Sequence, residues 1–77
     1  MNNDRRKRVQ EVQARIADLL AEIDDLRSEE QEAFENLPES LQESERGERM
    51  EAAADALEEA YDSLESVDAS LDEALEA

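Results

Sequence analysis

VQEVQARIADLLAEIDDLRSEEQEAFENL, residues 9–37, decides the fold of this chain. Apolar residues recur in it at alternating steps of three and four, which is the heptad pattern of a helix that packs along a seam against another helix. With Val9 at heptad position a, large apolar residues fill seven of the nine a and d positions: Val9, Val12, Ile16, Leu19, Ile23, Leu26 and Leu37. The pattern predicts a long amphipathic helix over about 4–36, with the a and d residues facing inward.

Residues 46–76 carry the same repeat with a different distribution of side-chain size. With Met50 at a, the a positions hold large residues and the d positions hold mostly alanine. They are Met50, Leu57, Leu64 and Leu71 at a, and Ala53, Ala60, Val67 and Ala74 at d. Small residues at every seventh position let two helices approach closely. We therefore expect a second helix over about 46–76, with Tyr61 beside its seam.

The connector, about 37–45, contains the one proline of the chain. Pro38 lacks an amide hydrogen and disfavours helical dihedral angles in the residue before it, so the first helix should end there. Ser40 followed three residues later by Glu43 fits a capping box, which predicts a helix start. The turn could centre on Pro38 or extend as far as Gly47, and in either case the chain reverses.

Three polar residues of the first helix carry expectations of their own. Asp4 or Asn3 could cap it, because a short polar side chain can accept hydrogen bonds from the free amides of the first turn. Glu30 occupies an a position, where a charge could set the register, face an arginine or mark a place where the helices separate. We favour the last of these.

One chain of this size offers more apolar surface than it can cover alone. A chain of 77 residues is at most one domain, and two helices bury little area. Leu20 and Phe34, both at e, widen the apolar stripe, as suits a bundle. We expect a single-domain all-α antiparallel two-helix hairpin that dimerises into a four-helix bundle of coiled-coil type. The candidate core and self-association residues are Val9, Val12, Ile16, Leu19, Leu20, Ile23, Leu26, Phe34, Leu37, Met50, Leu57, Tyr61, Leu64, Val67 and Leu71. The relative direction of the two chains, and a higher oligomer, stay open.

The net charge of −16 belongs to the second part of the chain. Residues 1–27 carry six basic and six acidic side chains, whereas residues 28–77 carry two basic and eighteen acidic ones. Such a surface repels nucleic acid and attracts basic proteins, and carboxylates about 5–6 Å apart along a helix can imitate a row of phosphates. The candidate partner-binding residues are Asp55, Glu58, Glu59, Asp62 and Glu65. The alternative is that they form only the solvated face of a helix.

An antiparallel hairpin would also bring the basic N-terminus near the acidic C-terminus. We expect Arg5 to Arg8 to be neutralised there by Asp72, Glu73 and Glu76.

The composition argues against catalysis. The chain has no histidine and no cysteine, so the usual zinc ligands, the usual neutral-pH acid/base and the thiol nucleophile are all missing. We expect no enzyme activity, no metal site and no cofactor. No apolar run approaches the roughly 18 residues that span a bilayer, so a cytoplasmic protein without membrane contact is expected.

Arg27, Arg46 and Arg49 are cations close to the bend. They could reach the phosphate of a small ligand, which makes them candidate ligand-binding residues. Alternatively, the last two could form ion pairs with glutamates four residues away or nearer, among Glu43, Glu45 and Glu48.

EEQEAFENLPESLQ, residues 29–42, continued by SERGE, residues 44–48, resembles a stretch found in small, largely uncharacterised acidic helical proteins of phages and prophages. The resemblance implies a phage-associated protein in the cytoplasm of a host cell. Small acidic proteins in that setting often block host defence or nucleic-acid-binding enzymes. The resemblance assigns no site residues.

Three functions follow from these observations. The first is a non-enzymatic acidic interaction protein, a possible DNA mimic with an anti-defence role, that docks its carboxylates on a basic surface of a host protein. The second is a structural oligomerisation or spacer hairpin. The third is a helical bundle that binds a small phosphorylated ligand.

Overall fold

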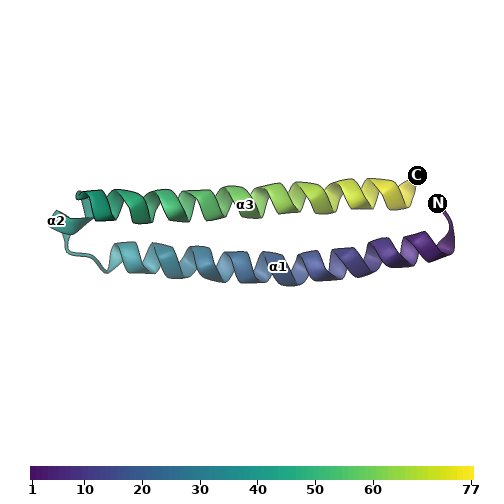
Figure 1. The fold of residues 1–77 in the computed structure, drawn as a ribbon, viewed down its shortest axis with the longest axis horizontal. Coiled ribbons are helices and arrows are strands. Elements are labelled where there is room, and N and C mark those ends of the chain that lie inside the picture. Colours follow the sequence, from purple (N-terminus) through teal and green to yellow (C-terminus); the bar gives the residue numbers. More distant parts are fainter.

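Three helices and no strand make up the chain in the computed structural model, which describes residues 1–77. The helices are α1 (Asn3–Glu35), α2 (Glu39–Gln42) and α3 (Glu45–Glu76). The prediction of an all-α chain is confirmed. The two long helices lie side by side and antiparallel, so both termini lie at one end and α2 lies at the other (Figure 1). The molecule measures 58 × 16 × 12 Å, and the 33 residues of α1 span about 50 Å of its long dimension.

The first turn of α1 is capped by Asn2. Its side-chain oxygen accepts a hydrogen bond from the amide of Arg5 at 2.8 Å. The expectation that Asn3 or Asp4 would cap this helix is wrong, because Asn3 already belongs to the helix and Asp4 lies in its first turn. A carboxylate at Asp4 still interacts favourably with the positive end of the helix dipole.

The connector between the long helices passes through α2. Pro38 precedes α2 with φ −56° and ψ 147°, and no side chain caps this short helix. The predicted capping box of Ser40 and Glu43 is wrong, because α2 has already begun at Glu39 and Ser40 lies inside it. The serine that caps a helix here is Ser44, at the start of α3.

Gln42 ties the connector to the end of α1. Its side-chain amide donates to the carbonyl oxygens of Leu37 at 3.0 Å and of Phe34 and Glu35 at 3.4 Å each. The last carbonyl groups of a helix have no amide partner within the helix. The side chain of Gln42 therefore satisfies backbone groups where α1 ends.

Gly47 lies where the first turn of α3 meets α2. It is buried, and its amide donates to the hydroxyl of Ser44 at 3.4 Å. A β-carbon at this position would lie 2.6 Å from the carbonyl oxygen of Leu41 and closer still to that of Gln42. Both neighbours are backbone atoms, so no side-chain rotation could relieve the overlap. Gly47 is thus needed for close approach, since no residue of the chain has a positive φ.

The seam between α1 and α3 follows heptad positions a and e. Ile16 at a of α1 is 5% exposed and Ala54 at e of α3 is 4% exposed, and the other a and e positions along the contact are half-buried. The α1 residues are Val9, Gln13, Ile16, Leu20, Ile23, Arg27, Glu30 and Phe34, and Leu37 follows in the connector. The α3 residues are Met50, Ala54, Leu57, Tyr61, Leu64, Asp68, Leu71 and Leu75.

The large d residues lie outside this seam. Leu19 is 47% exposed, Leu26 is 52% exposed and Val67 is 49% exposed, and Val12 is also exposed. The expectation that the d row would face the second helix is therefore wrong for the single chain. One partner helix covers only one strip of a helix surface, and the e residues occupy that strip together with the a residues.

Gly47→Ala should destabilise the connection between α2 and α3. Alanine favours a helix interior over glycine by about 1 kcal/mol, but the overlap with two backbone carbonyls should outweigh this and lower the free energy of unfolding by about 1–3 kcal/mol. Thermal unfolding followed by circular dichroism checks this. Gln10→Ala, at an exposed position of α1, is the control and should change little; a Gly47→Ala chain as stable as wild type would contradict the close approach.

Ile16→Ala and Leu19→Ala should show that the seam, and not the d row, stabilises the single chain. At concentrations low enough to keep the chain monomeric, Ile16→Ala should lower the free energy of unfolding by about 2 kcal/mol or more, because it removes the most buried large side chain. Leu19→Ala should change it by no more than about 0.5 kcal/mol. Urea denaturation measures both, and equal losses would show that the d row also packs inside one chain.

Candidate interaction surfaces

The d rows of α1 and α3 lie on the same face of the helix pair. Successive residues of an α-helix are about 100° apart, so d lies about 80° to one side of the line midway between a and e. Because α3 faces α1 and runs in the opposite direction, this rotation turns both d rows to the same side. We call their surface the apolar face. It consists of Val12, Leu19, Leu26 and Ala33 from α1 and Ala53, Ala60, Val67 and Ala74 from α3.

Contacts on the opposite face support this geometry. The side-chain amide of Gln13, at e of α1, donates to the carboxylate of Asp72, at b of α3, at 2.7 Å. Arg27 is also at e, and its pKa is raised chiefly by its hydrogen bond with Asp24 and to a smaller extent by the charge of Glu58, another b residue. The e residues of α1 thus meet the b residues of α3 on the side away from the d rows.

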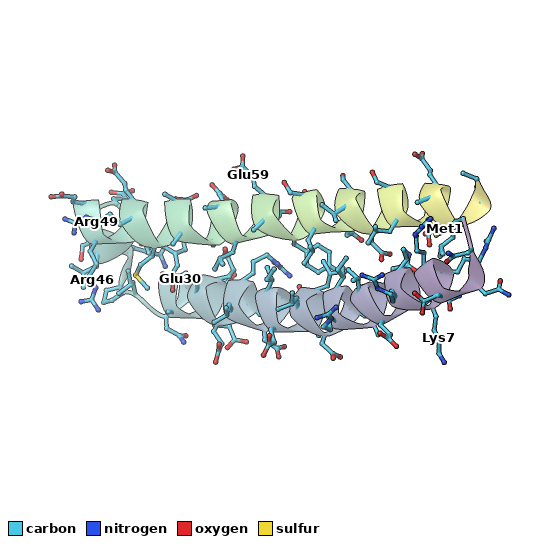
Figure 2. The ribbon with its side chains drawn as sticks, turned by 45° about the vertical axis from the view of Figure 1, so that its right-hand side comes forward. Met1, Lys7, Glu30, Arg46, Arg49 and Glu59 are labelled. Carbon is cyan, nitrogen blue, oxygen red and sulfur yellow. The ribbon has the colours of Figure 1, made fainter.

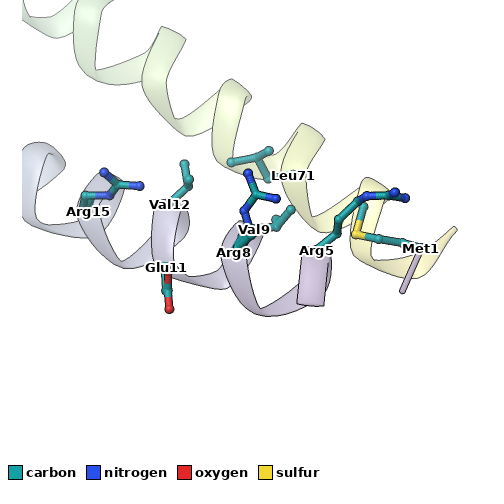
Figure 3. A pocket seen from close by; sticks show the side chains of 8 residues that line it. All are labelled: Met1, Arg5, Arg8, Val9, Glu11, Val12, Arg15 and Leu71. Atoms are coloured by element: carbon teal, nitrogen blue, oxygen red, sulfur yellow. The ribbon is translucent and has the colours of Figure 1, made fainter. Parts of the chain in front are cut away.

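A hollow of about 560 Å³ lies on the apolar face near the chain termini. Val9, Val12 and Leu71 supply apolar side chains to it, and Met1 closes the end next to the termini (Figure 3). The lining also includes three arginines, Arg5, Arg8 and Arg15, together with Glu11. In Figure 3 the side chain of Glu11 points away from α3, whereas Val12 points toward it. The hollow is therefore apolar and edged by positive charge.

The opposite side of α3 carries the acidic face, which we define as its b and f carboxylates. They are Glu48, Glu51, Asp55, Glu58, Asp62, Glu65, Asp72 and Glu76, all exposed. Four of the five candidate partner-binding residues belong to this face. The fifth, Glu59, points away from α1 beside it (Figure 2). None of the five forms an ion pair within the chain.

The N-terminal basic residues do not pair with the acidic C-terminus, so that expectation is wrong. Arg6 instead donates to the carbonyl oxygen of Leu75 at 2.5 Å. This arginine lies at e, in the seam, where it meets the carbonyl groups that the last turn of α3 leaves unpaired. Lys7 points away from α3 (Figure 2), and Arg8 lies 3.9 Å from Asp4 of its own helix.

The three candidate ligand-binding arginines do not converge on one site. Arg27 lies 2.8 Å from Asp24, and Arg49 lies 2.6 Å from Glu45, which confirms the predicted ion pair with a neighbouring glutamate. The hydrogen bond that Arg27 donates to the carboxylate of Asp24, followed by the negative charge of that carboxylate, raises the pKa of Arg27. Arg27 is close to Glu58, which is nine residues, or roughly 13 Å, along α3 from Arg49.

Arg46 forms no ion pair, but it lies beside Arg49 in the first turns of α3, at the bend (Figure 2). Two of the three guanidinium groups are thus already held by carboxylates. The three arginines therefore do not form a cluster that could bind the phosphate of a small ligand.

Polar seam residues are the feature that sequence reasoning missed. Gln13, Arg27 and Asp68 all lie at e, in the contact between the long helices. The signal was present, because Leu20 and Phe34 at e of α1 and Tyr61 and Leu75 at e of α3 mark e as an inward position. The unbroken run of apolar d residues in α1, Val12, Leu19, Leu26 and Ala33, concealed it.

The structure contains no group of three or more side chains that could hold a metal ion. None of its helices combines the length and the apolar character that crossing a membrane requires. In comparisons with known proteins, the chain matches no family model, no curated protein and no solved structure.

Proposed function

We propose that this chain is a non-enzymatic protein-binding module, a hairpin that dimerises through its apolar face into a four-helix bundle of coiled-coil type. The observation that carries this proposal is the alignment of Val12, Leu19, Leu26 and Val67, all exposed, on one face. Contiguous exposed apolar residues of this kind mark interaction surfaces in proteins. A second copy would remove them from water.

The small interior of one chain supports the same proposal. Only 3 of 77 residues are buried, and two of them, Ala54 and Gly47, have small side chains or none. A two-helix unit of this size gains little stability from its own core, and natural proteins compensate through association, disulfides or metals. The chain has no cysteine, which leaves association as the available route here.

In such a dimer the acidic face of each copy points outward, and we propose that it docks on a basic surface of another protein. The support is electrostatic: the carboxylates of the acidic face form no ion pairs within the chain, so they are available to a partner. A row of carboxylates can take the place of nucleic-acid phosphates on such a surface. The resemblance of the bend segment to phage proteins suggests a host protein as the target.

The alternative function is a structural spacer with no partner on the acidic face. It needs only the apolar face and leaves the carboxylates solvated. Both functions require the dimer. They differ in whether reversal of charge on α3 abolishes binding to a partner protein.

Leu19→Glu combined with Leu26→Glu should dissociate the dimer. Two charges in the apolar face would have to be buried without partners, so the dissociation constant should rise roughly 100-fold or more. Sedimentation velocity over micromolar to millimolar concentrations measures this. Ala14→Glu with Ala21→Glu adds the same two charges to the exposed f positions of α1 and should leave the dimer intact.

The outcome that contradicts self-association is a wild-type chain that stays monomeric at high micromolar concentration. A double Leu19→Glu, Leu26→Glu chain that dimerises like wild type would show instead that another surface is used.

Reversing four carboxylates of α3 to lysine should abolish binding to a basic partner. The variant changes Glu58, Glu59, Asp62 and Glu65. Its matched control changes Glu11, Asp18, Asp25 and Glu32, the c residues of α1. Each set raises the net charge of −16 by eight, so both variants have the same total charge.

Affinity capture from host lysate at low and at high salt, with helicity checked by circular dichroism, compares the two variants. A partner that wild type retains only at low salt should be lost with the α3 set and kept with the α1 set. If both sets behave alike, total charge rather than the acidic face governs binding, and the spacer function is favoured.

A further inference from the structure

The outer edge of the apolar face, along position g of α1, carries opposite charges at its two ends. Arg8 and Arg15 lie toward the termini, and Glu22 and Glu29 lie toward the bend; all four are exposed. Arg15, Glu22 and Glu29 form no ion pair within the chain, and the one ion pair of Arg8, with Asp4, is long at 3.9 Å. These charges lack close partners in the single chain.

The charges are arranged symmetrically about the middle of α1. Arg15 and Glu22 are equally far from a point between Asp18 and Leu19, and so are Arg8 and Glu29. The apolar residues Val12 and Leu26 are equally far from Leu19 itself. A helix with this pattern is complementary to a copy of itself that runs in the opposite direction, which is the requirement of an interface with two-fold symmetry.

We propose that a second copy of this chain covers the apolar face with its α1 antiparallel to the first α1, about a two-fold axis that is perpendicular to the helices and passes close to Leu19. The proposal rests on the dimer of the proposed function and specifies how the two copies pair. Arg8 then faces the partner's Glu29, and Arg15 faces the partner's Glu22. The symmetry forms each pair twice.

The hollow on the apolar face fits the same arrangement. The residue opposite Val12 is the partner's Leu26, which is the most exposed large apolar residue of the chain. Its side chain would enter the hollow lined by Val9, Val12 and Leu71, while the arginines at the edge meet the glutamates that flank Leu26. One feature thus supplies both the apolar and the charged half of the contact.

The other two-fold arrangement of the bundle lacks this complementarity. An axis parallel to the helices would place α1 against the partner's α3, whose g residues over this stretch are Ala56, Ser63 and Ser70. Arg8 and Arg15 would then face no carboxylate at that edge. With the perpendicular axis, α3 lies against the partner's α3, where Val67 meets the partner's Ala60 and small side chains permit a close approach.

Two charge-reversed chains test the pairing. The glutamate variant carries Arg8→Glu and Arg15→Glu, and the arginine variant carries Glu22→Arg and Glu29→Arg. Each has one sign of charge along the whole g row, so each should dimerise at least about 10-fold more weakly than wild type at low salt. In an equimolar mixture every g pair becomes opposite in charge. Native mass spectrometry should then find mostly heterodimer, well above the half expected by chance.

A single-cysteine chain gives an independent measurement. The protein has no cysteine of its own, so Leu19→Cys introduces one thiol next to the proposed axis. Under oxidising conditions it should form a disulfide-linked dimer, whereas Glu59→Cys, on the outside of α3, should not. With the axis parallel to the helices, the two Leu19 positions would lie diagonally across the bundle, too far apart to join.

The outcomes separate this proposal from the one on which it rests. A statistical mixture of dimers, or a Leu19→Cys chain that stays uncrosslinked while wild type dimerises, overturns the antiparallel α1 pairing and leaves the dimer standing. A wild-type chain that is monomeric in sedimentation overturns the dimer itself.

Discussion

The structure depends on a geometric limit: one helix can cover only one strip along the surface of its neighbour. Both long helices carry apolar residues at a, d and e, a stripe broader than one partner covers. The antiparallel pair uses a and e, so Ile16 and Ala54 are buried while Leu19 and Val67 stay exposed. The apolar face, the hollow on it and the small interior all follow from the packing of the two helices through positions a and e.

Polar residues inside the seam find hydrogen-bond partners in the antiparallel register that the chain adopts. Gln13 hydrogen-bonds to Asp72, and Arg6 donates to the carbonyl oxygen of Leu75 at the other chain end. A polar residue in a helical seam lowers stability but favours the register in which it finds a partner. At the bend, the side chain of Gln42 and the close approach at Gly47 hold the connector in a matching position.

The charges are divided between two faces, and this division makes self-association and partner binding compatible. The acidic face lies on the side of α3 away from the apolar face, so stacking two copies through the latter does not bring the two sets of carboxylates together. The strong negative charge of the chain would otherwise oppose association. On α1, the edge of the apolar face is positive toward the termini and negative toward the bend, a pattern that is complementary to an antiparallel copy of itself.

The sequence by itself determined the all-α character, the two long amphipathic segments and the break at Pro38, because heptad spacing and a missing amide hydrogen are local properties. It also determined the ion pair of Arg49 with Glu45, four residues apart on one helix. Only the tertiary structure decided that a and e form the seam, that Asn2 and Ser44 cap the long helices, and that Arg6 meets Leu75. The physical reason is that a helix with a broad apolar stripe can turn any part of it inward, and the rotation is fixed only when the second helix brings its own side chains into contact.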